Sequence, residues 1–189
     1  MREHEARGRR YRYMPKLNEI DHQLDRKTRC CRAIIETPQG SRSKFNFDPE
    51  TGLFKLAAVL PAGMAFPLSF GFIPGTEADD GDPVDILVLS DEPLPSGTLV
   101  LVRLLGVIEA EQTERDVTVR NDRLLGKVEA SHIWADVEEV DQLGNAFSDD
   151  LECFFETYNT LRGRRFKLRK VAGSDKACRL ISKAEIKSK

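Results

Sequence analysis

The chain is organised around the stretch FPLSFGFIPGTEADDGDPVDILVLS, residues 66–90. Within seven positions it places four aspartates, namely Asp79, Asp80, Asp82 and Asp85. Gly81 permits a tight turn, and Pro83 has a fixed φ and no backbone donor, so this segment cannot be helical. The apolar run at positions 86–89 is short and β-rich, which is typical of a buried strand. The sequence therefore predicts a loop that carries carboxylates to the start of a strand.

The aspartate cluster has two interpretations. Carboxylates crowded at the start of a strand repel one another, and a divalent cation such as Mg²⁺, which prefers oxygen ligands, relieves that repulsion. A solvated turn is the alternative, because an Asp-Gly pair is also a common hairpin signal. An EF-hand fits poorly, since with Gly81 as the loop glycine its first and third ligand positions hold Thr76 and Ala78.

Length and composition indicate one globular domain with a tail. The chain has 189 residues, of which 40% are hydrophobic. Charges interrupt every apolar run well before the roughly 18 residues that a membrane span needs, and the N-terminus lacks the apolar region of a secretion signal. We therefore expect a cytoplasmic protein with no membrane partner. The four cysteines, at 30, 31, 153 and 178, have no metal-site spacing and are expected to be free thiols.

The N-terminal segment is basic. Residues 1–32 hold ten Lys or Arg against five Asp or Glu, a charge of +5, and the net charge of −2 leaves −7 for the remainder. We expect residues 1–30 to form a basic N-terminal extension and residues 31–189 to form the main domain. Such an extension can contact nucleic acid, but a solvated, partly ordered arm is the favoured interpretation.

Short strands dominate the body of the chain. Strands are expected at 33–36, 44–47, 53–60 and 86–89, with turns at 39–41 and 48–52. A long apolar strand follows at 98–111, in which Gly106 marks a bulge or a close approach of backbone. The polar stretch 111–122 suggests a hairpin tip, and strands return at 124–128 and 164–171.

Two helices come late in the chain. In the first, between 148 and 162, the apolar residues follow helical spacing; they are Leu151, Phe154, Phe155, Tyr158 and Leu161. Asp149 and Glu152 suggest its capping box and Gly163 its end, while Ser174 is expected to cap the second helix. Many short strands followed by two helices predict an α+β fold, with a closed or partly closed barrel and the helices packed outside.

Several sequence blocks point to one known family. The segment DGDPVD at 80–85 is preceded by GFIP at 71–74 and followed by GVI at 106–108 and FFETY at 154–158. With these blocks in this order, the chain resembles the soluble, family I inorganic pyrophosphatases over most of residues 32–171. The resemblance implies an OB-like five-stranded β-barrel with two C-terminal helices packed outside. It also implies Mg²⁺ as cofactor and a homo-oligomer.

The same resemblance implies hydrolysis of pyrophosphate to two phosphates by metal-activated water, with a role for each matching residue. Asp82 is the expected base for the attacking water. Asp80 and Asp85 are expected to hold the activating metals, and Glu36 a further one. Substrate phosphate is expected to contact Lys44, Arg123 and Tyr158, where Arg123 stands at a position that is commonly lysine in the family.

The chain also departs from the family pattern. Asn46 and Asn121 replace acidic residues, Ala58 replaces an arginine, Asn159 a lysine, and Phe66 and Phe70 two tyrosines. Glu111, Glu114 and Asp122 are candidates to compensate for Asn121. Lys55 lies three residues from Ala58, so in a regular strand it points to the opposite face and does not replace the arginine.

Three hypotheses follow. The first is a Mg²⁺-dependent inorganic pyrophosphatase, and the second is a phosphohydrolase of the same fold with altered substrate or weakened activity, because most of the missing groups belong to the substrate side. The third is a non-catalytic module that binds nucleic acid as OB-folds can. The acidic body and the placement of the aromatic residues in apolar runs argue against the third.

Overall fold

The computed structural model describes residues 17–79 and 81–186. Its strands are β1 (Cys30–Thr37), β2 (Ser43–Asp48), β3 (Leu53–Val59), β4 (Ser69–Phe72), β5 (Asp85–Leu89), β6 (Leu99–Glu114), β7 (Val117–Arg120), β8 (Arg123–Val128) and β9 (Arg165–Gly173). Its helices are α1 (Gly144–Thr160) and α2 (Ser174–Ala184), with short 3₁₀ turns η1 (Leu17–Glu19) and η2 (Val140–Leu143). The strands predicted from turn residues and apolar runs are present.

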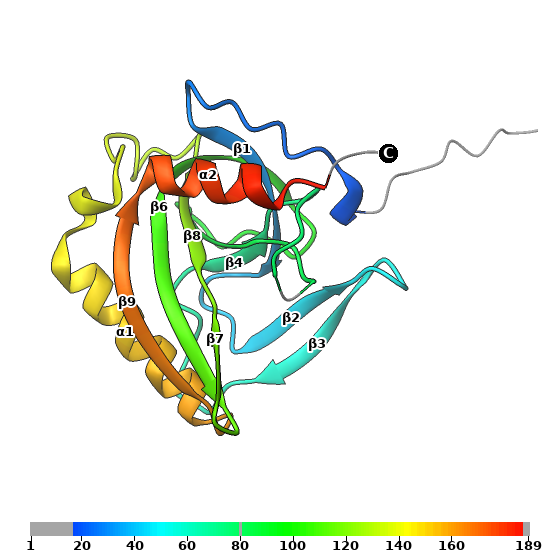
Figure 1. The fold of residues 1–189 in the computed structure, drawn as a ribbon, viewed down its shortest axis with the longest axis vertical. Coiled ribbons are helices and arrows are strands. Elements are labelled where there is room, and N and C mark those ends of the chain that lie inside the picture. The colour runs from blue at the N-terminus through cyan, green and yellow to red at the C-terminus, as the bar shows by residue number, and fades with distance from the viewer. Residues whose placement is uncertain (1–16, 80, 187–189) are drawn as a thin grey trace, which may run out of the picture.

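Five strands close into a ring. The order is β1, β4, β5, β8 and β6, and β1 pairs with both β4 and β6, which joins the two ends (Figure 1). Only β5 and β8 are parallel within this ring. The expected five-stranded barrel of an α+β fold is thus confirmed, and closure gives each of these five strands a neighbour on both sides.

The long strand β6 holds the barrel together because it pairs with four other strands. It contacts β1 and β8 through its first half and β9 and β7 through its second. The register with β8 shifts between Leu104 and Gly106, so the expected bulge is present. At Gly106 the backbone of β9 also approaches closely: a Cβ there would overlap the carbonyl oxygen of Ala172. Gly106 therefore serves both of the purposes that the sequence suggested.

Helix α1 begins earlier than the sequence predicts. It starts at Gly144 and follows directly from η2, so Asp149 and Glu152 lie inside the helix and do not form its cap. The capping contacts lie one element earlier, at η2, where the side chain of Gln142 accepts hydrogen bonds from the backbone N–H groups of Glu138 and Glu139. The apolar side chains Leu143 and Phe147 pack on the same cluster as Leu151, which extends the helix toward its N-terminus.

Helix α2 starts at the predicted residue, Ser174, but with a different cap. The Ser174 hydroxyl donates to Glu139 Oε1 at 2.7 Å, and its backbone N–H donates to Glu139 Oε2 at 3.2 Å. The cap is therefore a carboxylate that precedes η2, not the serine hydroxyl. Alternate residues of β5 join two apolar clusters, with Ile86 and Val88 beside residues of α2, and Leu87 and Leu89 beside residues of α1.

Part of the N-terminal extension lies on the barrel. Residues 22–25 lie beside β1, where the N–H of Arg32 donates to the carbonyl of His22 at 2.7 Å and the N–H of Asp25 donates to the carbonyl of Cys30 at 2.9 Å, and the His22 side chain is buried. Residues 1–16 lie outside the described part of the chain. All four cysteines are free thiols, as expected. Within residues 17–79 and 81–186, no helix has the length and apolar character that crossing a bilayer requires.

Candidate active site

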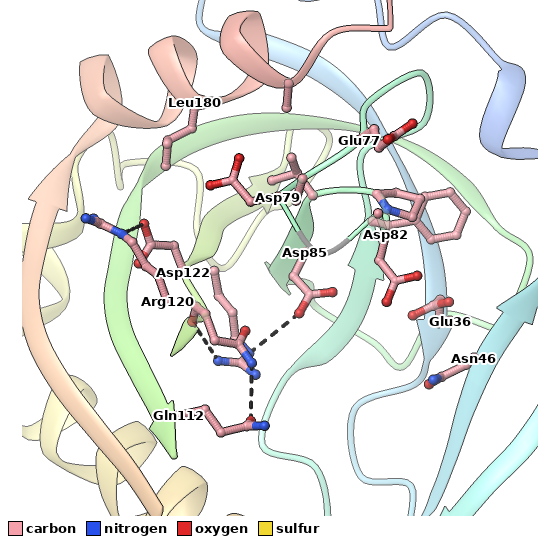
Figure 2. Close-up of a pocket in the computed structure, with 18 of the residues that line it drawn as sticks. Glu36, Asn46, Glu77, Asp79, Asp82, Asp85, Gln112, Arg120, Asp122 and Leu180 are labelled. Atoms are coloured by element: carbon pink, nitrogen blue, oxygen red, sulfur yellow. Dashed lines mark hydrogen bonds and ion pairs between the residues drawn. The ribbon is translucent and has the colours of Figure 1, made fainter. Parts of the chain in front are cut away.

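A cleft of about 860 Å³ opens beside the acidic loop. Strands β1, β2, β5 and β8 and helices α1 and α2 all contribute side chains to its wall. Figure 2 shows acidic groups from the loop facing Glu36 and Asn46 across it. The cleft therefore gathers residues that are far apart in the sequence.

Local hydrogen bonds shape the acidic loop. The N–H of Ala78 donates to the carbonyl of Asp82 at 2.7 Å, and the N–H of Gly81 donates to the carbonyl of Ala78 at 3.0 Å. Gly81 has a φ of 87°, a left-handed conformation that glycine adopts without strain. At the base of the loop, the Thr76 hydroxyl donates to the carbonyl of Ile73 and accepts from the N–H of Val84. The loop is a defined turn held at its neck.

The segment before β1 and the end of α2 both hold this loop in place. The N–H of Gly75 donates to the carbonyl of Asn18 at 2.7 Å, and the carbonyl of Gly75 accepts from the N–H of Ile186 at 2.9 Å. The N–H of Glu77 donates to the carbonyl of Ala184, the last residue of α2, at 2.8 Å. The position of the carboxylates thus depends on segments before β1 and after α2.

Three predicted carboxylates share the cleft. Asp82 precedes β5, Asp85 begins it, and Glu36 comes from β1 (Figure 2). Glu36 Oε1 accepts a hydrogen bond from the N–H of Phe47 at 2.6 Å. Burial raises the pKa of Glu36 to about 7, and the negative charges of Asp85 and Asp82 act in the same direction. Glu36 therefore lies in a partly buried region of the cleft, close to two other negative charges.

The other two aspartates of the cluster differ. The side chain of Asp79 is 97% exposed and lies 3.8 Å from Lys183 Nζ, so it belongs to the rim of the cleft. Asp80 lies outside the described residues. In the described part of the chain, no three His, Cys, Asp or Glu side chains are grouped so that they could hold a metal ion. The donor set fits a hard divalent cation all the same, because it consists of carboxylate oxygens whose mutual repulsion such a cation relieves.

Arg123 is buried beside the carboxylates. Its Nε lies 3.9 Å from Asp85 Oδ2, and its Nη1 donates to the carbonyl of Asn121 at 3.1 Å. The guanidinium lies over the ring of Phe155, 4.5 Å from the centroid. Burial lowers the pKa of Arg123 below its ordinary value, and the charge of Asp85 opposes that effect. Ring stacking is a contact that a lysine at this position makes less well.

Lys44 and Tyr158 also line the cleft. Lys44 comes from β2, and its positive charge acts to lower the pKa of Glu36, which places it near the carboxylates. The Tyr158 ring packs against Phe66 and Phe154, with centroids 5.9 Å away in each case. Its hydroxyl accepts a hydrogen bond from Arg162 Nη1 at 2.9 Å. The ring is part of the core, and only the hydroxyl is placed for chemistry.

The substituted positions are occupied by structural groups. Phe66 and Phe70 pack edge to face, with centroids 5.0 Å apart. Asn159 is 1% exposed and donates to the carbonyl of Phe155 at 2.8 Å, so it turns into the helix and away from the cleft. Asn46 and Asn121 do line the cleft, and the Asn121 amide donates to Gln112 Oε1 at 3.2 Å.

The predicted orientation of Lys55 is wrong. Strand β3 has a bulge, because Lys44 pairs with Ala58 while the next residue, Phe45, pairs with Leu56. Ala57 is therefore the extra residue, and Lys55, the partner of Asn46, lies on the same face as Ala58. Even so, Lys55 Nζ lies 2.7 Å from Asp48 Oδ2 and the residue does not line the cleft.

Of the three acids proposed to compensate for Asn121, only Asp122 lines the cleft. Its two carboxylate oxygens accept from the N–H of Ala110 at 3.2 Å and from Arg120 Nε at 2.7 Å. Glu111 pairs with Arg169 and Glu114 with Arg164. Each of the three acids therefore already forms an ion pair with an arginine of this chain.

Five cationic residues of the cleft wall were not among the predicted site residues. They are Arg120, Arg162, Arg164, Lys176 and Lys183. Arg162 follows Tyr158 by four residues, the spacing at which helical side chains meet, and this is the signal that could have identified it. The cleft therefore carries more positive charge than the family motif alone suggested.

The closed barrel, its two helices and the acidic cleft define an α+β protein of the OB-barrel type. The family model for inorganic pyrophosphatase matches residues 33–189. The chain belongs to the inorganic pyrophosphatase family, whose soluble members are metal-dependent enzymes.

Individual relatives agree with this assignment. The inorganic pyrophosphatase of Thermus thermophilus is 36% identical over 140 residues, which cover 74% of this chain and 78% of that one. The Helicobacter pylori enzyme is 32% identical over 171 residues, or 88% of this chain and 93% of that one. The crystal structure of the Thermus thermophilus protein superposes with a TM-score of 0.81 at 29% identity, covering 90% of this chain and 97% of that one.

Proposed function

We propose that this protein hydrolyses inorganic pyrophosphate to two phosphates in the acidic cleft, with Mg²⁺ as its cofactor. The observation that carries the proposal is the family match over residues 33–189, in a chain whose Glu36, Asp82 and Asp85 line one cleft. Pyrophosphate is small and highly charged, so its hydrolysis depends mainly on positioning and on neutralisation of charge.

Each side of the cleft has a proposed task. Asp82 takes the proton of the attacking water, and Asp80, Asp85 and Glu36 supply oxygen ligands. When bound, Mg²⁺ neutralises phosphate charge and makes a coordinated water more acidic. On the opposite side, Lys44 and Arg123 neutralise the substrate phosphates, and the Tyr158 hydroxyl donates a hydrogen bond to one of them. The buried Arg123 keeps its direction toward Asp85 because its guanidinium is stacked on Phe155.

The test compares phosphate release by the wild-type protein and by Asp82→Asn, each with Mg²⁺ and with excess EDTA. We expect Asp82→Asn to lose a factor of about 10² to 10⁴ in kcat, the range associated with a positioned general base. Asp79→Asn is the matched control, because the Asp79 side chain is at the exposed rim, and it should retain nearly full activity. Equal release by wild type and Asp82→Asn would remove Asp82 from its role.

Altered substrate preference is the second candidate, favoured by Ala58 and Asn159 at positions that carry cations in the family. A panel of pyrophosphate, tripolyphosphate and nucleotides decides between the two, and fastest turnover of pyrophosphate rules out the second. A homo-oligomer and a cytoplasmic location stay predictions. Sedimentation of the purified protein tests the first of these, and fractionation of cells that express it tests the other.

A further inference from the structure

We infer that Arg162 is a substrate-binding residue, whose guanidinium holds a phosphate group of pyrophosphate in place of the arginine and lysine that this chain lacks. This inference rests on the proposed function. It names the cation that makes up for Ala58 and Asn159 on the phosphate side of the cleft.

Arg162 is held at a defined place in the wall of the cleft. Helix α1 ends at Thr160, and the N–H of Arg162 then donates to the carbonyl of Asn159 at 2.9 Å. Gly163, with a φ of 71°, turns the chain into β9. This tight turn leaves Arg162 exposed at the cleft, one helical turn after Tyr158.

The side chain of Arg162 is directed at Tyr158. Its Cζ lies 5.3 Å from the centroid of the Tyr158 ring, and its Nη1 donates to the Tyr158 hydroxyl at 2.9 Å. An arginine that only ends a helix commonly donates to the last carbonyl groups. Here the guanidinium instead lies beside a hydroxyl that is itself a proposed phosphate ligand.

Most other cations of the cleft wall have a carboxylate nearby, although the pairs of Arg123 and Lys183 are long, at 3.9 and 3.8 Å. Within 4.0 Å, Arg120 has Glu109 and Asp122, Arg123 has Asp85, Arg164 has Glu114, Lys176 has Glu109, and Lys183 has Asp79. Among the residues that the structure describes, Arg162 and Lys44 have no such partner. Lys44 is already a proposed phosphate ligand, as is Arg123, so Arg162 is a further positive charge that can meet an anion without first leaving a carboxylate.

The chemistry of the pair suits a phosphate. A guanidinium is a planar fork of donors that matches phosphate oxygens, and only one nitrogen of Arg162 is engaged by Tyr158. Because the Tyr158 hydroxyl accepts from Arg162, its own proton is directed elsewhere and can be donated to a phosphate oxygen. Arg162 and Tyr158 together therefore present donors without a competing acceptor.

The two substituted positions cannot supply this cation themselves. Asn159 is buried and its amide is engaged by Phe155. Ala58 has no polar side chain, and its neighbour across the hairpin is Lys44. Arg162, three residues after Asn159, restores a positive charge at the same end of α1.

The test measures KM and kcat for pyrophosphate in wild type, Arg162→Ala, Arg162→Lys and Arg165→Ala. Arg165 is the matched control, because it is an exposed arginine three positions further on that does not line the cleft. We expect Arg162→Ala to raise KM by about tenfold or more, as the loss of a charged hydrogen bond implies. Arg162→Lys should recover part of this loss, and Arg165→Ala should leave KM unchanged.

A second measurement is the dissociation constant of imidodiphosphate, a pyrophosphate analogue with a bridging nitrogen, determined by calorimetry. The dissociation constant should rise in Arg162→Ala by a factor similar to KM, with an unchanged melting temperature. Wild-type turnover together with unchanged KM and binding in Arg162→Ala overturns the assignment of Arg162 alone. Binding that depends on Arg162 in a wild-type protein without turnover overturns the proposed hydrolysis and keeps the phosphate site. Absence of both turnover and binding in wild type overturns both.

Discussion

Arg123 and Asp85 lie side by side at the start of two parallel strands, with Nε 3.9 Å from Oδ2. The register of β5 and β8 causes this proximity, because Ile86 pairs with Leu124 and the preceding residues enter together. Arg123 is a proposed phosphate ligand, and Asp85 is a proposed metal ligand. The metal side and the phosphate side of the cleft therefore meet at this pair.

The Arg123→Met variant removes the positive charge of this residue and keeps most of its packing. Methionine keeps an unbranched side chain against Phe155 but cannot neutralise phosphate. We expect kcat/KM for pyrophosphate to fall by about 10- to 100-fold, since a charged hydrogen bond contributes about 1.5–3 kcal/mol. The free energy of unfolding should fall less than in Arg123→Ala, because methionine keeps the packing against Phe155, whereas both variants leave Asp85 without its cation. Urea denaturation beside steady-state kinetics measures both quantities, and Arg123→Ala is the control that loses the packing together with the charge. Wild-type kinetics in Arg123→Met would argue against the assigned role.

Glu36→Gln should have opposite effects on stability and on metal binding. In the metal-free protein, burial raises the pKa of Glu36 to about 7 from an ordinary value of 4.5. Between these values the folded state binds more protons than the unfolded state, so the ionisation of Glu36 lowers stability as the pH rises. In EDTA at pH 8, we expect Glu36→Gln to be more stable than wild type by up to about 3 kcal/mol. Below pH 4.5 the difference should vanish, because Glu36 is then protonated in both states.

Added Mg²⁺ supplies the control for this prediction. The amide that replaces the Glu36 carboxylate in the variant can still accept from the N–H of Phe47, but it has no charge to offer a cation. Mg²⁺ should therefore raise the melting temperature of wild type more than that of Glu36→Gln. Denaturation curves at several pH values, with and without Mg²⁺, test both statements. If the variant is no more stable than wild type at pH 8 in EDTA, the ionised Glu36 does not destabilise the folded state.

Local signals in the sequence predicted most of the fold. Turn residues such as Gly52, and the β-rich run after Asp85, specify strands through short-range geometry. Closure of the barrel depends on β1 pairing with both β4 and β6, which is a long-range choice that no single segment encodes. For that reason the strand pattern left a closed and a partly closed barrel as alternatives.

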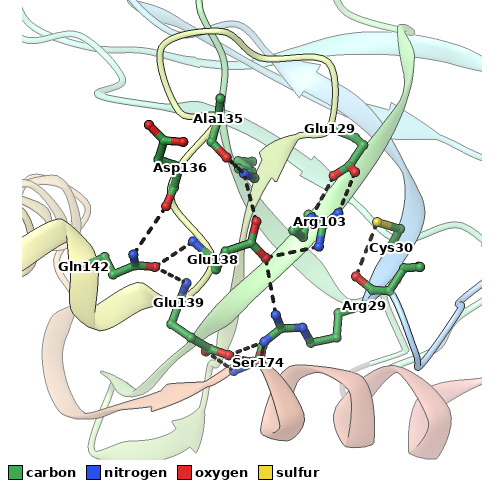
Figure 3. Close-up of polar contacts among 12 residues, drawn as sticks. Arg29, Cys30, Arg103, Glu129, Ala135, Asp136, Glu138, Glu139, Gln142 and Ser174 are labelled. Carbon is green, nitrogen blue, oxygen red and sulfur yellow. Dashed lines mark hydrogen bonds and ion pairs between the residues drawn. The ribbon is translucent and has the colours of Figure 1, made fainter.

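Helix caps were less predictable for the same reason. Glu139 caps α2 from across the fold, and it also pairs with Arg29, as Figure 3 shows. Arg103 pairs with Glu129 and Glu138 in the same network. A capping box within one segment can be recognised from spacing, whereas a carboxylate supplied by another element cannot.

The candidate site shows a similar division. The structure places Glu36, Asp82 and Asp85 in one cleft, although their roles stay predictions. The orientation of Lys55 depended on a bulge at Ala57 that only the pairing with β2 determines. The proposed role of Arg162 was inferred from which other cations of the cleft have carboxylate partners. Both are properties of tertiary neighbours and not of local sequence.

Asp48→Asn should make the β2–β3 hairpin less stable at neutral pH. Hydrogen bonds from Lys55, at 2.7 Å, and Thr51, at 2.6 Å, lower the pKa of Asp48 to about 2 from 3.8. A carboxylate with a lowered pKa contributes stability above pH 3.8, and this contribution is lost as the pH falls through 2. The melting temperature of Asp48→Asn should therefore lie below that of wild type at pH 7 and approach it near pH 2. Glu50→Gln, on the same turn, serves as the control for the loss of one negative charge, and a difference independent of pH would refute the explanation.

Gly106→Ala tests the close approach of β6 and β9. An added Cβ would overlap the carbonyl oxygen of Ala172 and lie 2.8 Å from Val140 Cγ1. Neither group moves freely, because one is backbone and the other is buried, so we expect a loss of about 3 kcal/mol or more in the free energy of unfolding. Gly126→Ala is the matched control, since its Cβ would lie 3.1 Å from the carbonyl oxygen of Arg103 and 3.3 Å from Ile86 Cδ1, contacts that small shifts relieve. Urea denaturation of both variants measures the difference. Equal losses at the two glycines would mean that the cost arises from adding a methyl group to any barrel strand and not from the contact with β9.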